Sequence, residues 1–236
     1  MLVMYPVGYI IMLNDSLKIS YLSTSSFYLF VQSLMTFIIL AEFTSRSKAI
    51  TASFVIIFFS LLIEGIGVHT GFPFGNYSYT NTLSPILPGG VPLAIGFAWM
   101  TLSINSFLIV KYFLCKKNTC IVVILSGIFI AFIDVLLEPF ASFINNYWFW
   151  EGGTIPIQNY ISWFIIGILF SYTVNRIIGR NIQSVKISIP IIILVLSIFQ
   201  FIIFNILNGY YIYSVIGISG ILIIYLSIII LRKNEK

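Results

Sequence analysis

The sequence predicts an all-α fold: a polytopic transmembrane helical bundle of about seven helices, forming a single integral membrane domain over residues 1–236. Of the 236 residues, 59% are hydrophobic and only 8% are charged, and the mean hydropathy is +1.06. A soluble domain carries roughly a quarter charged residues. The apolar runs are continuous and lack the alternation of outer-membrane strands, which indicates helices rather than a β-barrel.

Seven stretches are long enough to cross a bilayer, whose ~30 Å core requires ~20 helical residues. They are residues 22–43, 49–68, 91–112, 119–138, 160–178, 187–207 and 212–231. Residues 1–13 are apolar but too short to cross alone, and they lack the basic leader and cleavage site of a signal peptide. We expect them to form a half-span or to lie against the bundle.

The basic residues predict the orientation of the bundle. In an alternating seven-helix topology only Lys18 falls on one side, and the other eleven of the 12 lysines and arginines fall on the opposite side. These eleven are Arg46, Lys48, Lys111, Lys116, Lys117, Arg176, Arg180, Lys186, Arg232, Lys233 and Lys236. The positive-inside rule makes their side cytoplasmic. It predicts a multi-pass cell-membrane protein with a cytoplasmic C-terminus and with the long loops 69–90 and 139–159 on the outer side. The net charge of +5 then reflects orientation, and no nucleic-acid partner is expected.

Two similar segments suggest an internal repeat. "GGVPLAIGFAW" begins at Gly89 and "GGTIPIQNYISW" begins at Gly152. Each contains a glycine pair, an aliphatic residue followed by proline, and a tryptophan seven residues after that proline. Each also follows a predicted span with acid near its outer end, so we expect two parallel helix–loop–helix units, an arrangement that places a site between the halves. The tryptophans could instead be interfacial anchors.

Three of the seven acidic residues lie inside predicted spans, all in the outer third: Glu64, Asp134 and Glu138. Asp134 and Glu138 are four residues apart and therefore share a helix face. No basic residue is expected at that depth, and an apolar environment without a cation favours the protonated carboxyl. One acid that keeps its proton beside another that has lost it can act as general acid and general base. The alternative is that these carboxyls only bridge helices by hydrogen bonds.

The remaining candidate ligands argue against a metal or cofactor. His69 is the only histidine, whereas di-iron and bis-histidine haem sites need more than one. Cys115 and Cys120 flank the segment "CKKNTC" without further thiol or imidazole partners, which makes a poor metal site. No nucleotide-binding or nucleophile-elbow motif is found. We expect no metal and no cofactor.

Several motifs together resemble the carotenoid hydratase family, which includes bacterial carotenoid 1,2-hydratases and archaeal bisanhydrobacterioruberin hydratases. They are "EGIGVHTGFPFGNYSY" at residues 64–79, "GVP" followed by Trp99, "DVLLEP" at 134–139, "YWFW" at 147–150 and "IPIQNYISWF" at 155–164. The likeness covers residues 60–165, a motif-bearing core with both long loops. The family also holds members described only as carotenoid biosynthesis proteins, so the resemblance alone does not fix the reaction.

The resemblance implies cofactor-free addition of water to a terminal isoprenoid double bond of an acyclic carotenoid, giving a tertiary alcohol. Asp134 is the implied acid, and Glu138 or Glu64 is the implied base that activates water. The implied substrate-binding residues are His69, Phe74, Tyr77, Tyr79, Trp99, Trp148, Trp150, Asn159 and Trp163. The partners are then a lipophilic carotenoid and the lipid bilayer, and association with other carotenoid-pathway enzymes is compatible with this reading.

Two other functions fit the same residues. The acids could form the relay of a proton-coupled carrier, or the chain could be a non-catalytic membrane subunit that binds carotenoid for a partner enzyme. Transporters usually place polar groups near the midplane, whereas here they gather on one side, which favours the enzyme. The sequence leaves open the carotenoid chain length, hydration at one or both ends, the roles of the individual acids, the oligomeric state and the role of residues 1–13.

Overall fold

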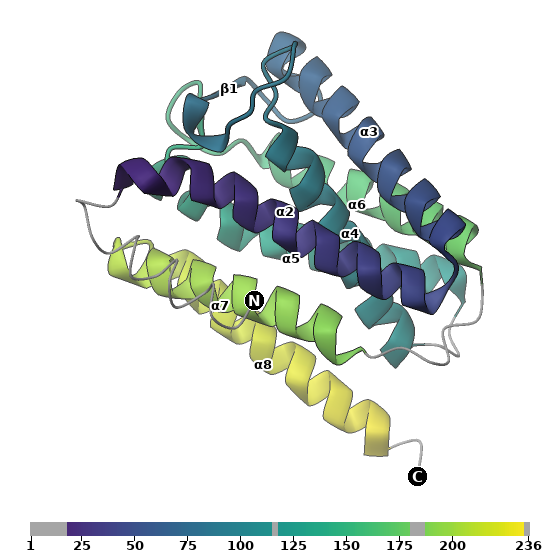
Figure 1. Cartoon of the computed structure of the whole chain (residues 1–236). Coiled ribbons are helices and arrows are strands. Elements are labelled where there is room, and N and C mark those ends of the chain that lie inside the picture. Colours follow the sequence, from purple (N-terminus) through teal and green to yellow (C-terminus); the bar gives the residue numbers. More distant parts are fainter. Residues whose placement is uncertain (1–17, 115–117, 180–186, 234–236) are drawn as a thin grey trace.

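The computed structural model describes residues 18–114, 118–179 and 187–233, and seven long helices run through them, as predicted (Figure 1). They are α2 (Lys18–Phe43), α3 (Arg46–Thr70), α4 (Leu93–Phe113), α5 (Thr119–Glu138), α6 (Ile157–Ile178), α7 (Ser188–Leu207) and α8 (Tyr211–Lys233). Among the described residues, six helices are long and apolar enough to cross a membrane. The apolar segment Tyr211–Tyr225 of α8 is shorter than these six. The predicted segment 1–13 lies outside the described residues.

Helix α4 is the centre of the bundle. It packs against α2, α3, α5, α6 and α7, and most of its side chains are buried. Helix α8, yellow in Figure 1, lies at the edge of the bundle against α7 and α5. Many of its described apolar side chains, such as Ile212 and Leu222, are exposed. Such an apolar outer surface suits a helix that faces lipid.

The predicted repeat is present as two units with the same order of elements, α3–β1–α4 and α5–β2–α6. Strands β1 (Tyr77–Tyr79) and β2 (Trp148–Trp150) pair antiparallel, with Tyr77 opposite Trp150 and Tyr79 opposite Trp148. The pairing joins the two units at one end of the bundle, which we call the loop end. The opposite end carries Lys48, Lys111 and Arg176, and we call it the basic end.

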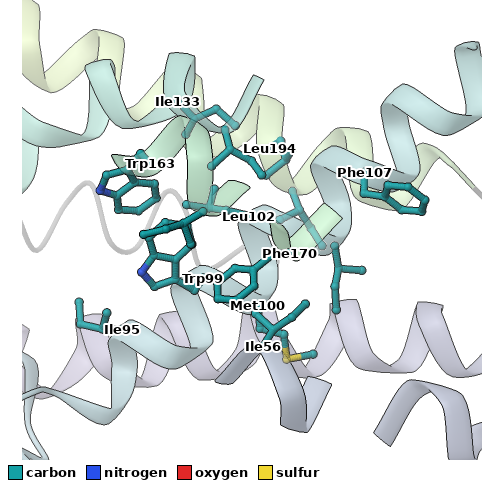
Figure 2. Packing of buried hydrophobic residues seen from close by; sticks show 14 of the residues in the cluster. Ile56, Ile95, Trp99, Met100, Leu102, Phe107, Ile133, Trp163, Phe170 and Leu194 are labelled. Carbon is teal, nitrogen blue, oxygen red and sulfur yellow. The ribbon is translucent and has the colours of Figure 1, made fainter. Parts of the chain in front are cut away.

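The return helices of the two units begin alike and meet. Pro92 and Pro156 are the N-cap residues of α4 and α6, where a missing backbone donor costs nothing. Seven residues further on, Trp99 and Trp163 stack with ring centroids 4.0 Å apart. Figure 2 shows these two indoles lying against each other in the apolar core. Equal spacing from each proline therefore brings the two tryptophans to the same depth.

Helices α5 and α6 approach each other through glycines. A Cβ added to Gly127 would lie 2.9 Å from the carbonyl oxygen of Phe164, and one added to Gly167 would lie 3.2 Å from Gly127 Cα. Small residues permit this backbone contact, as in many membrane helix pairs. About two turns nearer the loop end, the same helix pair positions Asp134 and Asn159.

The helix ends at the loop end differ from the predicted loop boundaries. Residues 139–159 were expected as a loop, but the chain stays helical as a π-helical turn over Pro139–Ile144, and α6 begins at Ile157. Pro139 has no N–H to continue the α-helical ladder, and the wider turn forms bonds such as Asn145 N to Phe140 O, 3.1 Å. Helix α3 extends to Thr70 and ends at Gly71, whose left-handed φ of 72° suits glycine.

We predict that Gly127→Ala destabilises the protein. The new Cβ would lie 2.6 Å from Ile168 Cγ1 and 2.9 Å from Phe164 O. Because the second contact is with backbone, α5 and α6 must separate, and overpacking of this kind costs about 1–3 kcal/mol. Gly65→Ala is the matched control, since a Cβ there meets nothing within 4 Å. Thermal unfolding in detergent measures both variants, and equal melting temperatures would contradict the close α5–α6 contact.

Candidate functional site

The structure brings the three predicted acids together in the interior of the bundle near the loop end. The exposed fractions of Glu64 on α3 and of Asp134 and Glu138 on α5 are 4%, 0% and 1%. Asn159 bonds both Asp134 and Glu138, and Tyr77, a donor to Glu64, packs against Trp150, a donor to Glu138. Burying carboxyl groups is costly unless hydrogen bonds replace their hydration. The donors that surround them therefore decide what each acid can do.

Glu64 accepts three hydrogen bonds. The hydroxyls of Tyr77 and Tyr79 donate to Oε2 at 2.5 Å and 2.7 Å. The indole Nε1 of Trp99 donates to Oε1 at 2.9 Å. Strand β1 supplies the two tyrosines from alternate positions, which point to the same side of a strand. Glu64 is thus tied to both later elements of its own unit, β1 and α4.

Glu138 is held in the equivalent way by the second unit. Trp148 and Trp150 of β2 donate from Nε1 to Oε2 at 3.3 Å and 2.9 Å. Asn159 of α6 donates from Nδ2 to Oε1 at 2.9 Å. The sequence left open the roles of the individual acids. The hydrogen bonds from the strand make Glu138 the counterpart of Glu64 in the second unit.

Asp134 has a different environment. Its Oδ2 accepts one hydrogen bond from Asn159 Nδ2, at 3.0 Å, while its Oδ1 is buried without a hydrogen-bond partner in the described part of the chain. Asn159 therefore uses a single amide nitrogen to bridge Asp134 and Glu138. The bridge holds the two acids of α5 side by side and leaves one oxygen of Asp134 unbound.

The donor arrangement limits which of the three acids can hold a proton. An ionised carboxylate only accepts hydrogen bonds, whereas a protonated carboxyl must turn one O–H away from any donor. Both oxygens of Glu64 and of Glu138 face donors, which suits the carboxylate form. Oδ1 of Asp134 faces none in the described structure. Among the carboxyl oxygens of the three acids, Oδ1 of Asp134 is therefore the one that can carry a proton without displacing a donor in the described structure.

Comparison of the two units shows that Asp134 and Asn159 have no counterparts in the first unit. The position four residues before Glu64, equivalent to Asp134, is Ser60, whose hydroxyl donates to the carbonyl of Ile57 at 3.0 Å. The position four residues before Trp99, equivalent to Asn159, is Ile95. The caged glutamate and the stacked tryptophan occur in both units, whereas the second acid and its amide occur in the second unit alone. Structural needs shared by both halves therefore do not explain Asp134 and Asn159.

Aromatic rings cover the acids from the loop end. Phe74 packs edge-on against Tyr77 at a centroid distance of 6.0 Å, Tyr77 lies 5.1 Å from Trp150, and Tyr79 lies 5.9 Å from Trp148. Phe74, Tyr77, Trp148 and Trp150 are all buried. The same rings that hold the carboxylates thus present π-electron faces beside them, which can stabilise positive charge.

Burial, followed by the charge of Glu64, raises the pKa of Tyr77 and that of Tyr79 above the ordinary value for tyrosine. Both phenols therefore remain protonated donors at physiological pH. This agrees with the direction of their hydrogen bonds to Glu64.

His69 lies outside this cluster. Its side chain is exposed in the last turn of α3, where Nδ1–H donates to the carbonyl of Gly65 at 2.8 Å. The other predicted substrate-binding residues lie in or next to the cluster: Phe74, Tyr77, Tyr79, Trp99, Trp148, Trp150, Asn159 and Trp163. His69 therefore belongs to the sequence motif but lies outside the cluster that other residues of the motif form.

Two residues that support the site, Gly67 and Asn205, were not predicted from the sequence. Gly67 lies one turn after Glu64, and a Cβ there would come within 2.9 Å of both Tyr77 OH and Phe74 Cδ2. Asn205 of α7 donates to the carbonyl of Leu136 at 3.0 Å, beside the π-helical turn. A buried amide in the apolar run of α7 was the available signal for Asn205. Gly67 had none, because its role depends on a strand ten residues away in the sequence.

Comparison with known proteins identifies the family of the chain. The family model described as "Carotenoid biosynthesis protein" matches residues 24–225. The chain belongs to the carotenoid biosynthesis protein family. It is 30% identical over 127 residues to the bisanhydrobacterioruberin hydratase of Haloarcula japonica, a match covering 50% of this chain and 43% of that protein. The chain thus matches less than half the length of that relative, and no solved structure matches it.

We predict that Tyr77 and Tyr79 lower the free energy of unfolding of this protein at alkaline pH. An unfolded tyrosine ionises near pH ~10, whereas burial and Glu64 raise the pKa of both native tyrosines. Above pH ~10 the native state therefore holds more protons than the unfolded state, and stability falls by up to ~1.4 kcal/mol per pH unit for each group. Denaturant unfolding of the wild type and of Tyr79→Phe at rising pH measures the effect. The variant should show the shallower decline, and parallel curves would contradict the burial of this phenol against a carboxylate.

Proposed function

We propose that the protein is a carotenoid hydratase that adds water across a terminal isoprenoid C=C bond of an acyclic carotenoid to give a tertiary alcohol. The observation that carries the proposal is Oδ1 of Asp134, which is buried and has no hydrogen-bond partner among the described residues, beside the caged carboxylate of Glu138. This pair offers a proton donor and a proton acceptor one helical turn apart. The resemblance of the motifs, the family membership and the name of the haloarchaeal relative support the same reaction.

In the proposed first step, Asp134 transfers its proton from Oδ1 to the less substituted carbon of the terminal double bond. The C=C π-electrons form the new C–H bond, and the other carbon becomes a tertiary carbocation. Asp134 is left as a carboxylate. The carboxylates of Glu64 and Glu138 and the faces of Tyr77 and Trp150 supply negative charge and π-electrons to the cation.

In the second step, the oxygen of a water molecule attacks the carbocation while Glu138 accepts the proton that the water loses. This forms the C–O bond of the tertiary alcohol. Transfer of that proton from Glu138 back to Asp134 restores the starting state, so alkene and water give alcohol with no other reactant. Asn159 keeps the two carboxyls adjacent throughout. Glu64 contributes negative charge. It is a weaker candidate for the base than Glu138, because three donors already hydrogen-bond its carboxylate.

The topology belongs to the same proposal. The basic end would be cytoplasmic, together with the C-terminus, and the loop end with β1 and β2 would face the outer side, following the distribution of lysine and arginine. The acids then lie in the outer part of the bundle. A carotenoid is about as long as a bilayer is thick, so one end group can reach this depth while the rest of the polyene stays in lipid.

The direct test is expression in a host that makes an acyclic carotenoid such as lycopene. We predict a new pigment heavier by one water per hydrated end. Asp134→Asn should lower the rate by about 10²–10⁴-fold, the usual contribution of a general acid, while the protein stays folded in the membrane. Transport of the pigment without a mass change would indicate the carrier, and copurified but unconverted pigment would indicate the binding subunit. Unchanged hydration by Asp134→Asn would dismiss the acid assignment.

A second prediction concerns the amide bridge. Asn159→Leu removes the donor shared by Asp134 and Glu138 and imitates the apolar residue at the equivalent position of the first unit, Ile95. We expect a loss of kcat of at least about tenfold, because each acid then loses its fixed position. Asn208→Ala is the control, since this amide donates to the carbonyl of Phe204 at the end of α7. Equal rates for the two variants would show that the bridge is not needed.

A further inference from the structure

The faces of α3 and α4 that carry Glu64 and Trp99 also carry buried serines, on the side toward the basic end. We call them the serine seam: Ser53, Ser60, Ser103 and Ser106. On α3, Ser60 and Ser53 lie four and eleven residues before Glu64; on α4, the other two lie four and seven residues after Trp99. These spacings return to the same face of a helix. The hydrogen bond from Trp99 to Glu64 brings the two faces together, so the seam starts at the acids.

Three of the four hydroxyls of the seam differ from that of Ser60, which donates to the carbonyl of Ile57. Ser53, Ser103 and Ser106 have buried hydroxyls without a hydrogen-bond partner in the described residues. By contrast, Ser126 of α5 donates to the carbonyl four residues earlier, at 2.8 Å. A buried polar group left unsatisfied costs about 1–3 kcal/mol. Groups of this kind in native proteins are usually satisfied by bound water.

The seam extends from the acids to the basic end. With a helical rise of ~1.5 Å per residue, Ser106 lies ~10 Å from Trp99 and Ser53 lies ~16 Å from Glu64, at nearly the depth of the buried Lys111. Helix α6, which contacts both α3 and α4, forms the third wall. Its Phe170 meets Trp99 edge-on at 5.6 Å, and the two rings lie together in Figure 2.

The loop end offers a less suitable route for water. Above the acids lie the rings of Phe74, Tyr77, Tyr147, Trp148 and Trp150, each no more than 7% exposed. The β1–β2 pairing holds three of these residues in place: Tyr77, Trp148 and Trp150. Water that reaches Glu64 through the interior therefore has hydroxyl partners along the seam and apolar rings on the other side.

We infer that the serine seam binds a file of water molecules that connects the basic end of the bundle with Glu64. The file supplies water, the second reactant of the proposed hydration, to the side of the acids away from the aromatic layer. Its use in turnover rests on the proposed function, but its presence does not. Glu64, at the head of the file, then holds the arriving water next to Asp134 and Glu138.

X-ray radiolysis tests the presence of this water, because hydroxyl radicals formed from bound water oxidise the side chains next to it. The experiment uses the full chain with Cys115 and Cys120 replaced by serine, carrying Ser103→Cys, Ser106→Cys or Ser126→Cys. Ser126 is the matched control, as it is equally buried but its hydroxyl is bonded within α5. Mass spectrometry should show several-fold faster oxidation at positions 103 and 106 than at 126. Equal rates at all three positions would overturn the inference.

Hydration kinetics test the use of the water. Ser106→Val places a larger apolar side chain in the seam and should lower kcat several-fold with an unchanged KM for the carotenoid, whereas Ser126→Val should keep both. Should Ser106→Val fail to fold, the radiolysis comparison decides alone. Oxidation at 103 and 106 in a protein that hydrates no carotenoid would uphold the seam and reject the hydratase. Hydration by a protein without that oxidation would reject the seam and uphold the hydratase.

Discussion

The structure depends on one constraint: three carboxyl groups must be buried side by side, and the donors that the described chain gives them are neutral. Phenol, indole and amide groups donate hydrogen bonds to the carboxylates of the two glutamates. Each donor can reach its carboxylate because the helix or strand that carries it is held in position. Strands β1 and β2 exist at the loop end because alternate residues of a strand can aim two donors at one carboxylate. The glycine contact of α5 with α6 and the tryptophan stack of α4 with α6 then set the distances.

The repeat explains why one acid differs from the other two. Each unit builds the same cage around a glutamate, and the cages meet through the antiparallel strand pair. Only the second unit adds Asp134 and Asn159, where the first has Ser60 and Ile95. In the proposed mechanism, the shared scaffold provides two fixed carboxylates, and the asymmetric pair provides the proton donor and the amide that positions it.

The sequence predicted the seven helices, the repeat and the depth of the three acids, because each depends on local composition or on short spacings such as the four residues between Asp134 and Glu138. It could not predict that Tyr77 and Trp150 face each other, since strand pairing joins residues far apart in the chain. The end of α5 at residue 138 was predicted correctly, but the start of the following loop was not, because the chain continues as a π-helical turn over Pro139–Ile144. His69, prominent in the motif, lies exposed outside the cluster.

The central claim is that Asp134 carries a proton in the resting protein while Glu64 and Glu138 are ionised. Infrared spectroscopy of the purified protein at neutral pH tests it directly, because a protonated carboxyl has a C=O stretching band that a carboxylate lacks. We expect one such band from a buried acid, absent in Asp134→Asn and retained in Glu64→Gln. A spectrum in which Asp134→Asn keeps the band, or in which Glu64→Gln removes it, would contradict the account.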